Sequence, residues 1–308
     1  MKASTRNFLL LLILASLWGP SFLFIKVAVR EISPIHLATL RIAVAAIAIN
    51  IFLKISGKPF KKDLKFWRDV TISGVFSLSL PFMLISWGEV YIDSALASIL
   101  NGLTPLFTII MANFLISDDK MTRPKLIGTI IGFAGLFVLV SPHLNSEMKA
   151  SSMGIAAVVL AACSYGVGMV YARLKLKGTP PLHAPASQLL TASIYMIPIA
   201  LFTDGVPAFA DISFNAIGSV LILALFGTAL AYIIFFKILE KASASYLSYV
   251  TYLIPIYGVI LGVAFLNESI STETVIGAGI ILTGLMIANK TIKITFKKPS
   301  FNSSSSES

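Results

Sequence analysis

The chain has 308 residues, of which 56% are hydrophobic and only 12% are charged, and its mean hydropathy is +0.88. A soluble domain carries about 25% charged residues, so this composition excludes an ordinary water-soluble fold as well as a charge-rich disordered chain. The formal net charge is +10, but the cations stand in short clusters between apolar runs, unlike the basic surface of a nucleic-acid-binding protein. The single cysteine, Cys163, excludes a disulfide framework and a zinc finger. These features together predict an integral membrane protein.

Long uncharged runs predict the membrane helices, because about 20 apolar residues cross the roughly 30 Å of bilayer hydrocarbon. Ten segments qualify in chain order, one of them extended across an arginine: 8–25, 34–53, 70–88, 94–117, 126–142, 150–172, 184–203, 212–236, 242–267 and 274–289. The first segment lacks a small-x-small cleavage pattern at Ala15-Ser16-Leu17, so it is expected to stay as a helix. The segments leave no room for a soluble domain.

The cations between these segments predict the orientation of the chain in the membrane, because cytoplasmic loops are rich in lysine and arginine. With the N-terminus inside, 20 of the 24 lysine and arginine residues lie on the inner side. Only Lys26, Arg30 and Lys149 fall outside, and Arg41 lies within a helix. Both termini are therefore expected in the cytoplasm, with the protein in the cell membrane. The serine-rich tail 291–308 is expected to be disordered.

The second half of the sequence repeats the first. With shifts of 147 to 150 residues, similar residues recur in the same order: Trp18 and Tyr165, Gly19 and Gly166, Pro34 and Pro181, Pro105 and Pro255, Asp118 and Glu268. The predicted domains are thus 8–142 and 150–290, with five helices each. Because five is odd, the second half enters the membrane from the opposite side. The expected fold is an all-α integral membrane protein with ten transmembrane helices in two inverted five-helix repeats, the usual construction of secondary transporters. A duplicated receptor or membrane enzyme is the alternative.

Several short motifs resemble a known transporter family. In the second half they are Gly227-Thr228, Leu253-Ile254-Pro255, Asn267-Glu268 and Ile276-Gly277, and in the first half Ser16-Leu17-Trp18-Gly19, Pro34, Arg41, Leu103-Thr104-Pro105 and Ile127-Gly128. Residues 8–290 resemble the EamA family of the drug/metabolite transporter superfamily, although Asp118 stands where the family usually has glutamate. The resemblance implies an exporter of amino acids, other metabolites or drugs, and does not select among these substrates.

Arg41 is the strongest single candidate for a binding residue. It lies seven residues after Pro34, which places it roughly 10 Å into the membrane at 1.5 Å per residue. An unpaired arginine there costs at least about 2.5–3.5 kcal/mol, so it is expected to face the protein interior, where its planar fork suits a substrate carboxylate. The alternative is that it snorkels to the outer interface or bonds a helix carbonyl. Gln188, its neutral counterpart in the repeat, leaves the site with one charged end.

Other candidate substrate contacts lie where the two halves match. Trp18 and Tyr165 are each followed by glycine at mid-membrane depth, where they either line a pocket for an apolar or aromatic substrate or simply pack. Polar side chains near the paired prolines are further candidates: Asn101, Tyr249 and Tyr252. The prolines themselves, Pro105 and Pro255, each free a carbonyl and kink a helix. They are either hinges or static kinks.

The remaining features predict packing rather than chemistry. Glycines give the segments 126–142 and 274–289 small faces that allow close helix contact, either within one chain or between two copies in a homodimer. Three acids near outer helix ends, Glu89, Asp93 and Glu268, are expected to be solvated, so no carboxylate is expected near mid-membrane and nothing requires proton coupling. The sequence shows no metal-ligand cluster, no nucleophile constellation and no phosphate loop, so we expect no cofactor and no metal.

These observations predict a secondary transporter rather than an enzyme. The expected activity is export of small organic metabolites, with amino acids or related carboxylates as the expected cargo, by alternating access. A bound ligand shifts such an equilibrium only by its differential affinity for the two states. The expected partners are a small-molecule substrate and the lipid bilayer, without nucleic acid. The alternative from another class is a membrane-embedded enzyme or sensor without transport activity, which requires convergent polar groups at one face.

Overall fold

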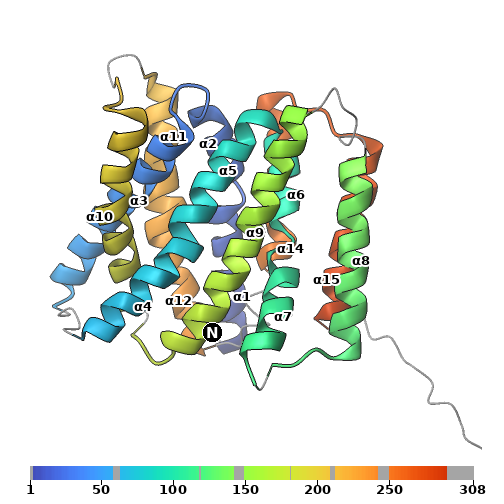
Figure 1. Cartoon of the computed structure of the whole chain (residues 1–308), viewed down its shortest axis with the longest axis horizontal. Coiled ribbons are helices and arrows are strands. Elements are labelled where there is room, and N and C mark those ends of the chain that lie inside the picture. The colour runs from blue at the N-terminus through green and yellow to red at the C-terminus, as the bar shows by residue number, and fades with distance from the viewer. Residues whose placement is uncertain are drawn as a thin grey trace, which may run out of the picture.

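The computed structural model describes residues 3–57, 63–117, 119–141, 149–180, 182–208, 212–241 and 250–289. Every regular element within these residues is helical, and the helices stand side by side in a bundle (Figure 1). We call the end of the bundle at which α1 begins, at the bottom of Figure 1, the lower face, and the opposite end the upper face. The predicted tail 291–308 lies outside the described residues.

The first half contains α1 (Ala3–Trp18), α2 (Ser21–Ala28), α3 (Pro34–Ile55), α4 (Leu64–Gly74), the π-helical segment η1 (Val75–Ser79), α5 (Leu80–Tyr91), α6 (Ser94–Asn101), α7 (Thr104–Leu115) and α8 (Arg123–Val140). The second half contains α9 (Lys149–Lys175), α10 (His183–Asp204), α11 (Phe214–Ala224), the π-helical segment η5 (Leu225–Leu230), α12 (Ala231–Lys241), α14 (Val250–Leu266) and α15 (Thr272–Ala288).

Within the described residues, eight helical stretches are long and apolar enough to cross a membrane, and two apolar helices, Leu253–Leu266 and Thr272–Ala288, are shorter. Large apolar side chains also cover the outside of the bundle. Phe202 and Phe214, for example, are 92% and 93% exposed. Exposed apolar surface on this scale marks contact with lipid or another apolar partner. The expected all-helical, multi-pass membrane protein is confirmed.

Two of the expected helices are broken where the sequence analysis placed continuous ones. The first expected helix, 8–25, separates into α1 and α2 at Gly19 and Pro20, because proline has no N–H to continue the hydrogen-bond ladder. The fourth, 94–117, separates into α6 and α7 around Gly102. At Gly19 a Cβ would lie 2.3 Å from the Cβ of Tyr257, so glycine is needed there for α14 to approach α1.

The two π-helical segments, η1 and η5, lie at corresponding places in the two halves. A π turn shifts the hydrogen-bond ladder by one residue and is often found at functional sites. Carbonyl groups of η1 accept hydrogen bonds from side chains of other helices: Ser164 Oγ on α9 donates to the Phe76 carbonyl at 2.9 Å, and Tyr232 Oη on α12 donates to the Ser77 carbonyl at 3.0 Å. The π-helical segments therefore join the two halves in the middle of the bundle.

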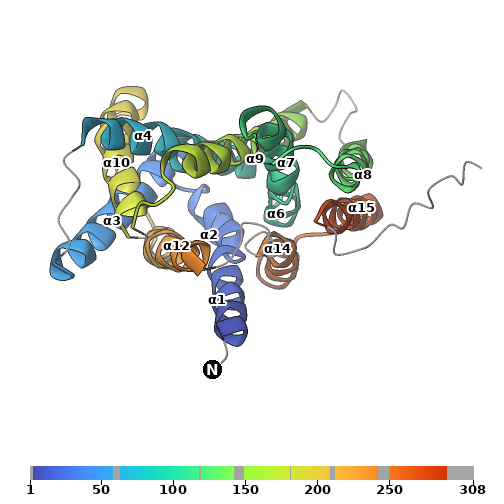
Figure 2. The ribbon, with the colours of Figure 1, turned by 90° about the horizontal axis from the view of Figure 1, so that it is seen from below.

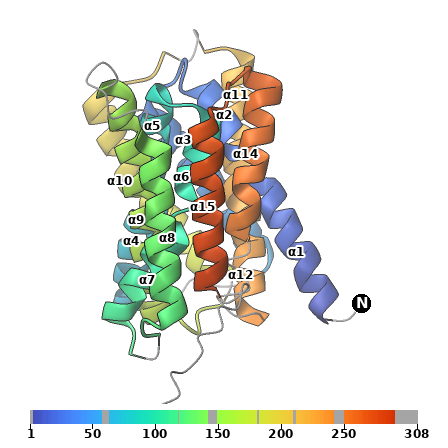
Figure 3. The same cartoon turned by 90° about the vertical axis from the view of Figure 1, so that its right-hand side faces the viewer.

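The glycine faces predicted for packing meet each other inside one chain. Helices α8 and α15 lie side by side (Figure 3), at one edge of the bundle as it is seen from below (Figure 2). They run antiparallel, because Gly128 faces Gly284 while Gly135 faces Gly277. A Cβ at Gly128 would lie 2.3 Å from the Gly284 carbonyl oxygen, which explains why only glycine fits. Contact between two copies of the chain remains a prediction.

At the lower face a carboxylate ties the α7–α8 turn to α9. Asp119 accepts hydrogen bonds from Lys125 and from Arg173, the latter at 2.6 Å. Partial burial raises the pKa of Asp119, but the hydrogen bonds from Lys125 and Arg173 outweigh that effect and hold its pKa below the ordinary value. Its stabilising contribution is therefore present above the pKa of the unfolded chain and is lost as the pH falls through the lower pKa of the folded state.

We expect Asp119→Asn to lower the stability of the protein by about 1 kcal/mol at neutral pH, the upper end for partly exposed ion pairs. The thermal unfolding midpoints of the variant and the wild type should converge as the pH falls, because the wild type then loses the same charge. Asp63→Asn is the matched control, since Asp63 caps α4 through the Lys65 amide and asparagine caps equally well. A gap between Asp119→Asn and wild type that persists in acid would contradict this role.

Candidate functional site

The buried guanidinium of Arg41 is the centre of the candidate site. The Arg41 residue is 6% exposed and its side chain reaches from α3 to η5 in the other half. There Nε donates a hydrogen bond to Thr228 Oγ1 at 2.8 Å, and Nη2 donates to the Gly227 carbonyl at 3.4 Å. Snorkelling to the outer interface is therefore wrong for this structure. The interior position and the contact with a helix carbonyl, which the sequence left as separate alternatives, occur together.

The charge of Arg41 is met by neutral groups. Its guanidinium carbon lies 3.8 Å from the centre of the Phe82 ring, a geometry in which the ring quadrupole attracts the cation. Thr228 donates its own hydroxyl proton to the Leu223 carbonyl at 2.9 Å, which turns a lone pair toward Arg41. In the described part of the chain no carboxylate forms an ion pair with Arg41. Two of its five N–H groups have acceptors there, so the group can receive an anion.

Further aromatic side chains lie in the region of this cation. Trp18, the last residue of α1, has its ring centre 6.2 Å from that of Tyr232 and 5.7 Å from that of Phe235. Tyr165 and Tyr232 both lie within electrostatic range of Arg41. Trp18 and Tyr165 also pack against the same two large apolar clusters. The structure thus brings the three strongest sequence candidates, Trp18, Arg41 and Tyr165, into one region.

The other candidate residues have contacts elsewhere. Gln188 is 2% exposed and donates its Nε2 to Ser73 Oγ at 2.7 Å, so it joins α10 to α4. Asn101 ends α6, where its carbonyl accepts the hydroxyl proton of Thr104 at 2.8 Å. The side-chain oxygens Gln188 Oε1 and Asn101 Oδ1 are buried and have no hydrogen-bond partner among the described residues. Tyr249 and the side chain of Tyr252 lie outside the described residues.

The two candidate hinges differ in their surroundings. Pro255 lies inside α14, as expected for a kink. Pro105 instead lies in the first turn of α7, directly after the break that separates α6 from α7. The expected kink within one helix is wrong at Pro105, because a proline in the first turn has no ladder bond to remove. Gly102 at this break lies close to Pro255, where a Cβ on it would be 3.7 Å from the proline ring.

Sequence reasoning missed three contributors to the site: Phe82, Thr228 and Tyr232. The signal for Thr228 was present, because Gly227-Thr228 is one of the family motifs. Tyr232 follows Thr228 by four residues and so lies on the same helix face. Phe82 carries no such signal, since one phenylalanine among many apolar residues does not reveal a cation above its ring.

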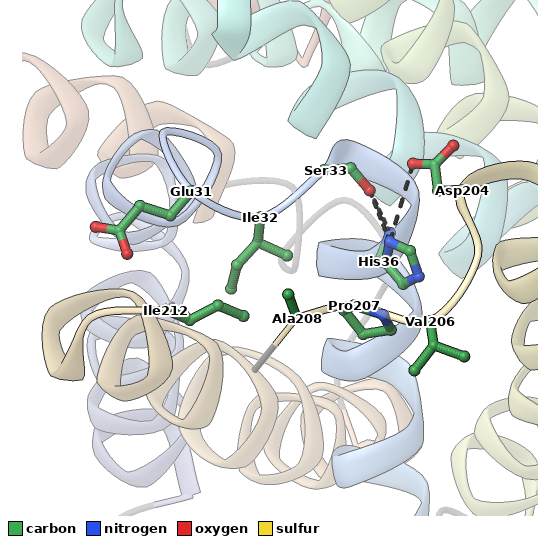
Figure 4. A pocket seen from close by; sticks show the side chains of 9 residues that line it. All are labelled: Glu31, Ile32, Ser33, His36, Asp204, Val206, Pro207, Ala208 and Ile212. Carbon is green, nitrogen blue, oxygen red and sulfur yellow. Dashed lines mark hydrogen bonds and ion pairs between the residues drawn. The ribbon is translucent and has the colours of Figure 1, made fainter. Parts of the chain in front are cut away.

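A second group of polar residues lies at the upper face around a cavity of about 480 Å³. Figure 4 shows Ser33, His36 and Asp204 converging at one end of this cavity, while Glu31 points away at the other end. His36 Nδ1 is 2.9 Å from Ser33 Oγ and 3.9 Å from Asp204 Oδ2. Hydrogen bonds from the amide and hydroxyl of Ser213 hold the pKa of Glu31 below its ordinary value. These contacts connect the α2–α3 turn to α10 and α11.

The expectation that three acids near the upper face are solvated is correct only for Asp93, which is exposed. Glu89 is 0% exposed, because α5 continues past it to Tyr91 and turns its side chain toward the core. Glu268 accepts hydrogen bonds from the amides of Ser94 and Ala95 at 2.8 and 2.9 Å. The expectation of a solvated carboxylate is therefore wrong at Glu89. The separate expectation that no carboxylate lies near mid-membrane is not contradicted by Glu89, which lies two residues before the end of α5 at Tyr91.

Membrane-length helices thus enclose a buried cation that forms no ion pair with a carboxylate among the described residues. The same fold occurs in a solved protein crystal structure, which aligns with a TM-score of 0.67 over 93% of this chain and 97% of the other, at 17% sequence identity. The EamA-like transporter family matches residues 6–141 and 152–290. The chain belongs to the EamA-like transporter family.

Two relatives illustrate the membership. An uncharacterized transporter of Archaeoglobus fulgidus is 30% identical over 92% of this chain and 98% of its own length. A probable amino-acid metabolite efflux pump of Salmonella typhimurium is 27% identical over 92% of this chain and 95% of its own length. These relatives carry transporter names, which indicates a family of transporters rather than of enzymes.

Proposed function

We propose that this protein is a secondary transporter that exports small organic carboxylates, with amino acids as the main class, across the cytoplasmic membrane by alternating access. The observation that carries the proposal is the guanidinium of Arg41, which is buried in the middle of the bundle and forms no ion pair with a described carboxylate. A charged group retained in a membrane interior is by default a functional site. A substrate carboxylate is the natural partner for its free N–H groups.

Alternating access requires two halves that move against each other, and we assign them to residues 8–142 and 150–290, as two inverted repeats of five membrane helices. Two separate matches to one family support this division, as do the corresponding π-helical segments η1 and η5. Arg41 of the first half bonds Thr228 of the second, which supports a substrate site between the halves, where inverted-repeat transporters bind their substrates.

We assign the lower face to the cytoplasm, with both chain termini on that side. The helix ends that gather there (Figure 1) carry most of the described cations, namely Lys54, Lys65, Arg68, Lys120, Arg123, Lys125, Arg173, Lys175 and Lys177. At the upper face the described cations are Lys26, Arg30 and Lys149, the first residue of α9. Cytoplasmic loops carry the excess of lysine and arginine.

The surroundings of Arg41 favour a substrate with an apolar or aromatic body. Tyr165 and Tyr232 lie within electrostatic range of the cation, and the Trp18 ring packs edge-on against Tyr232. An aromatic pair adds about 0.5–1.5 kcal/mol beyond its buried area. Leucine and phenylalanine combine a carboxylate with such a body. The relative named as a probable amino-acid metabolite efflux pump supports this class.

The test is efflux from vesicles that contain the purified protein. We expect vesicles loaded with labelled L-leucine or L-phenylalanine to release the label much faster than empty vesicles do. The matched probes 3-methylbutylamine and phenethylamine keep the same apolar bodies but lack the carboxylate, and they should be released at the rate of empty vesicles. Equal release of both amino acids from vesicles with and without the protein, repeated across a panel of other carboxylates, would contradict the proposed function.

A further inference from the structure

Glu89 is an acid without a partner inside the membrane-spanning bundle. Its residue is 0% exposed, and both carboxyl oxygens are buried without a hydrogen-bond partner among the described residues. It lies on α5 on the same helix face as Ile85 and three residues before Ile92, the extended residue that follows the helix, and both isoleucines belong to the largest apolar core cluster. A buried ionised carboxylate without donors is strongly unfavourable, so the geometry fits a carboxyl group that carries a proton.

The backbone beside Glu89 is held from both sides by charged residues distant in the sequence. Lys26 on α2 donates its ammonium to the carbonyls of Glu89 and Ile92, both at 2.7 Å. Glu268, in the turn between α14 and α15, accepts from the first two amides of α6, at Ser94 and Ala95. The turn from α5 to α6 is thus fixed to two other parts of the upper face. We call these contacts the upper clamp.

The charged groups that act on Glu89 come from three elements. Lys26 on α2 and Arg41 on α3 are cations, and Glu268 is an anion, all within electrostatic range. Asp93 lies four residues further on, beyond the end of α5. The part of α9 that packs on this end of α5, around Gly154 and Val158, carries no titratable side chain. Lys26 is thus a nearby cation, and its ammonium is bonded to two carbonyls rather than to the carboxyl group of Glu89.

We propose that Glu89 is a proton-binding site that controls the upper face: the upper clamp holds, as it does in this structure, only when Glu89 carries a proton. When the upper face opens, Glu89 reaches water and releases its proton. The ammonium of Lys26 then pairs with the new carboxylate and leaves the carbonyls of Glu89 and Ile92. The loss of these two hydrogen bonds breaks the part of the upper clamp that holds α2 to the α5–α6 turn. A cavity of about 320 Å³ lined by Asp93, Ala95 and Leu96 already reaches this turn from the upper face.

The direction of the pH effect follows from linkage. The closed state binds the proton and the open state releases it, so acid favours the closed upper face and alkali favours the open one. For a single group, the ratio of closed to open molecules falls by up to about tenfold per pH unit over the range in which only the open state is ionised. The inference rests on the alternating access proposed above, but its test needs no substrate, so its failure is distinguishable from a failure of the transport assay.

The test measures the distance across the upper clamp as a function of pH. Spin labels on Arg30→Cys and Tyr91→Cys, both exposed residues at the upper ends of α2 and α5, report the separation of these helices in a Cys163→Ala background. In lipid nanodiscs the short distance should dominate in mild acid and give way to a longer one in mild alkali. Glu89→Gln, which is permanently neutral, should keep the short distance throughout.

Glu273→Gln is the matched control, because Glu273 is an exposed acid at the same face, and it should behave as the wild type does. A wild-type distance that does not change with pH, or a Glu89→Gln variant with the pH response of the wild type, would overturn the proposal. An infrared measurement covers the case in which Glu89→Gln does not fold. The wild type in mild acid should show the carbonyl band of a buried protonated carboxyl group that fades in alkali, and its absence would equally overturn the proposal.

Discussion

Arg41→Lys is expected to weaken the apparent affinity for a carboxylate substrate roughly tenfold to hundredfold, although the charge is kept. A hydrogen bond to a charged group contributes about 1.5–3 kcal/mol, which corresponds to about that factor in affinity. In the structure, the Arg41 guanidinium lies over the Phe82 ring while its Nε bonds Thr228. Lysine has neither the planar group nor the fork of donors that this arrangement uses. Arg41→Gln should lose most carboxylate transport.

The measurement is the initial rate of L-leucine or L-phenylalanine efflux at several concentrations, divided by the amount of protein in the vesicles. Arg30→Gln is the matched control, because Arg30 is an exposed arginine in the turn after α2, and it should transport as the wild type does. An Arg41→Gln variant that keeps the wild-type apparent affinity would remove Arg41 from the substrate site. The vesicle panel would then decide separately whether the protein transports carboxylates at all.

Gly284→Ala is expected to lower the stability of the protein by about 1–3 kcal/mol, the usual effect of overpacking. A Cβ at this position would lie 2.5 Å from the Gly128 carbonyl oxygen and 2.6 Å from the Gly132 amide nitrogen. Both obstacles are backbone atoms of α8, so a side chain cannot move aside, and α8 and α15 must separate along their whole contact.

A second glycine on α15 supplies the control for this prediction. At Gly279 a Cβ would meet nothing within 4 Å, so Gly279→Ala should leave stability unchanged or raise it by up to about 1 kcal/mol through helix propensity. Gly284→Ala should therefore lower the thermal unfolding midpoint, whereas Gly279→Ala should leave it unchanged or raise it. Equal midpoints for both variants would show that the glycine contact does not hold α8 and α15 together.

The sequence predicted the helices better than their interruptions. Apolar runs reveal a membrane helix through its length, and the described residues contain eight helical stretches long and apolar enough to cross a membrane. The number of ten transmembrane helices stays a prediction. The break at Gly19 and Pro20 was predictable, because a glycine followed by a proline commonly interrupts a helix. The π-helical segments η1 and η5 were not readable, because a shift of one residue in the hydrogen-bond ladder depends on packing between helices and has no residue signature.

The candidate site was also predictable only in part. Arg41 was predictable because an arginine at that depth must find an interior partner. Its partner Thr228 is 187 residues away in the chain, and no local pattern places the two together. The burial of Glu89 was missed for a smaller reason. Helix α5 runs to Tyr91, three residues beyond the uncharged run that defined the predicted helix, so the acid falls inside the bundle.

The pairing of α8 with α15 also sets the order in which the chain can assemble. Helix α8 ends at Val140, and its main packing partner, α15, does not begin until Thr272. At roughly 5–20 residues per second, a ribosome needs on the order of ten seconds to synthesise the chain between them. During that interval the glycine face of α8 lies in the membrane without α15 packed against it. The fold therefore cannot be complete before α15 has been synthesised, and a chain cut short before α15 exposes a face by which a cell's quality control can recognise it.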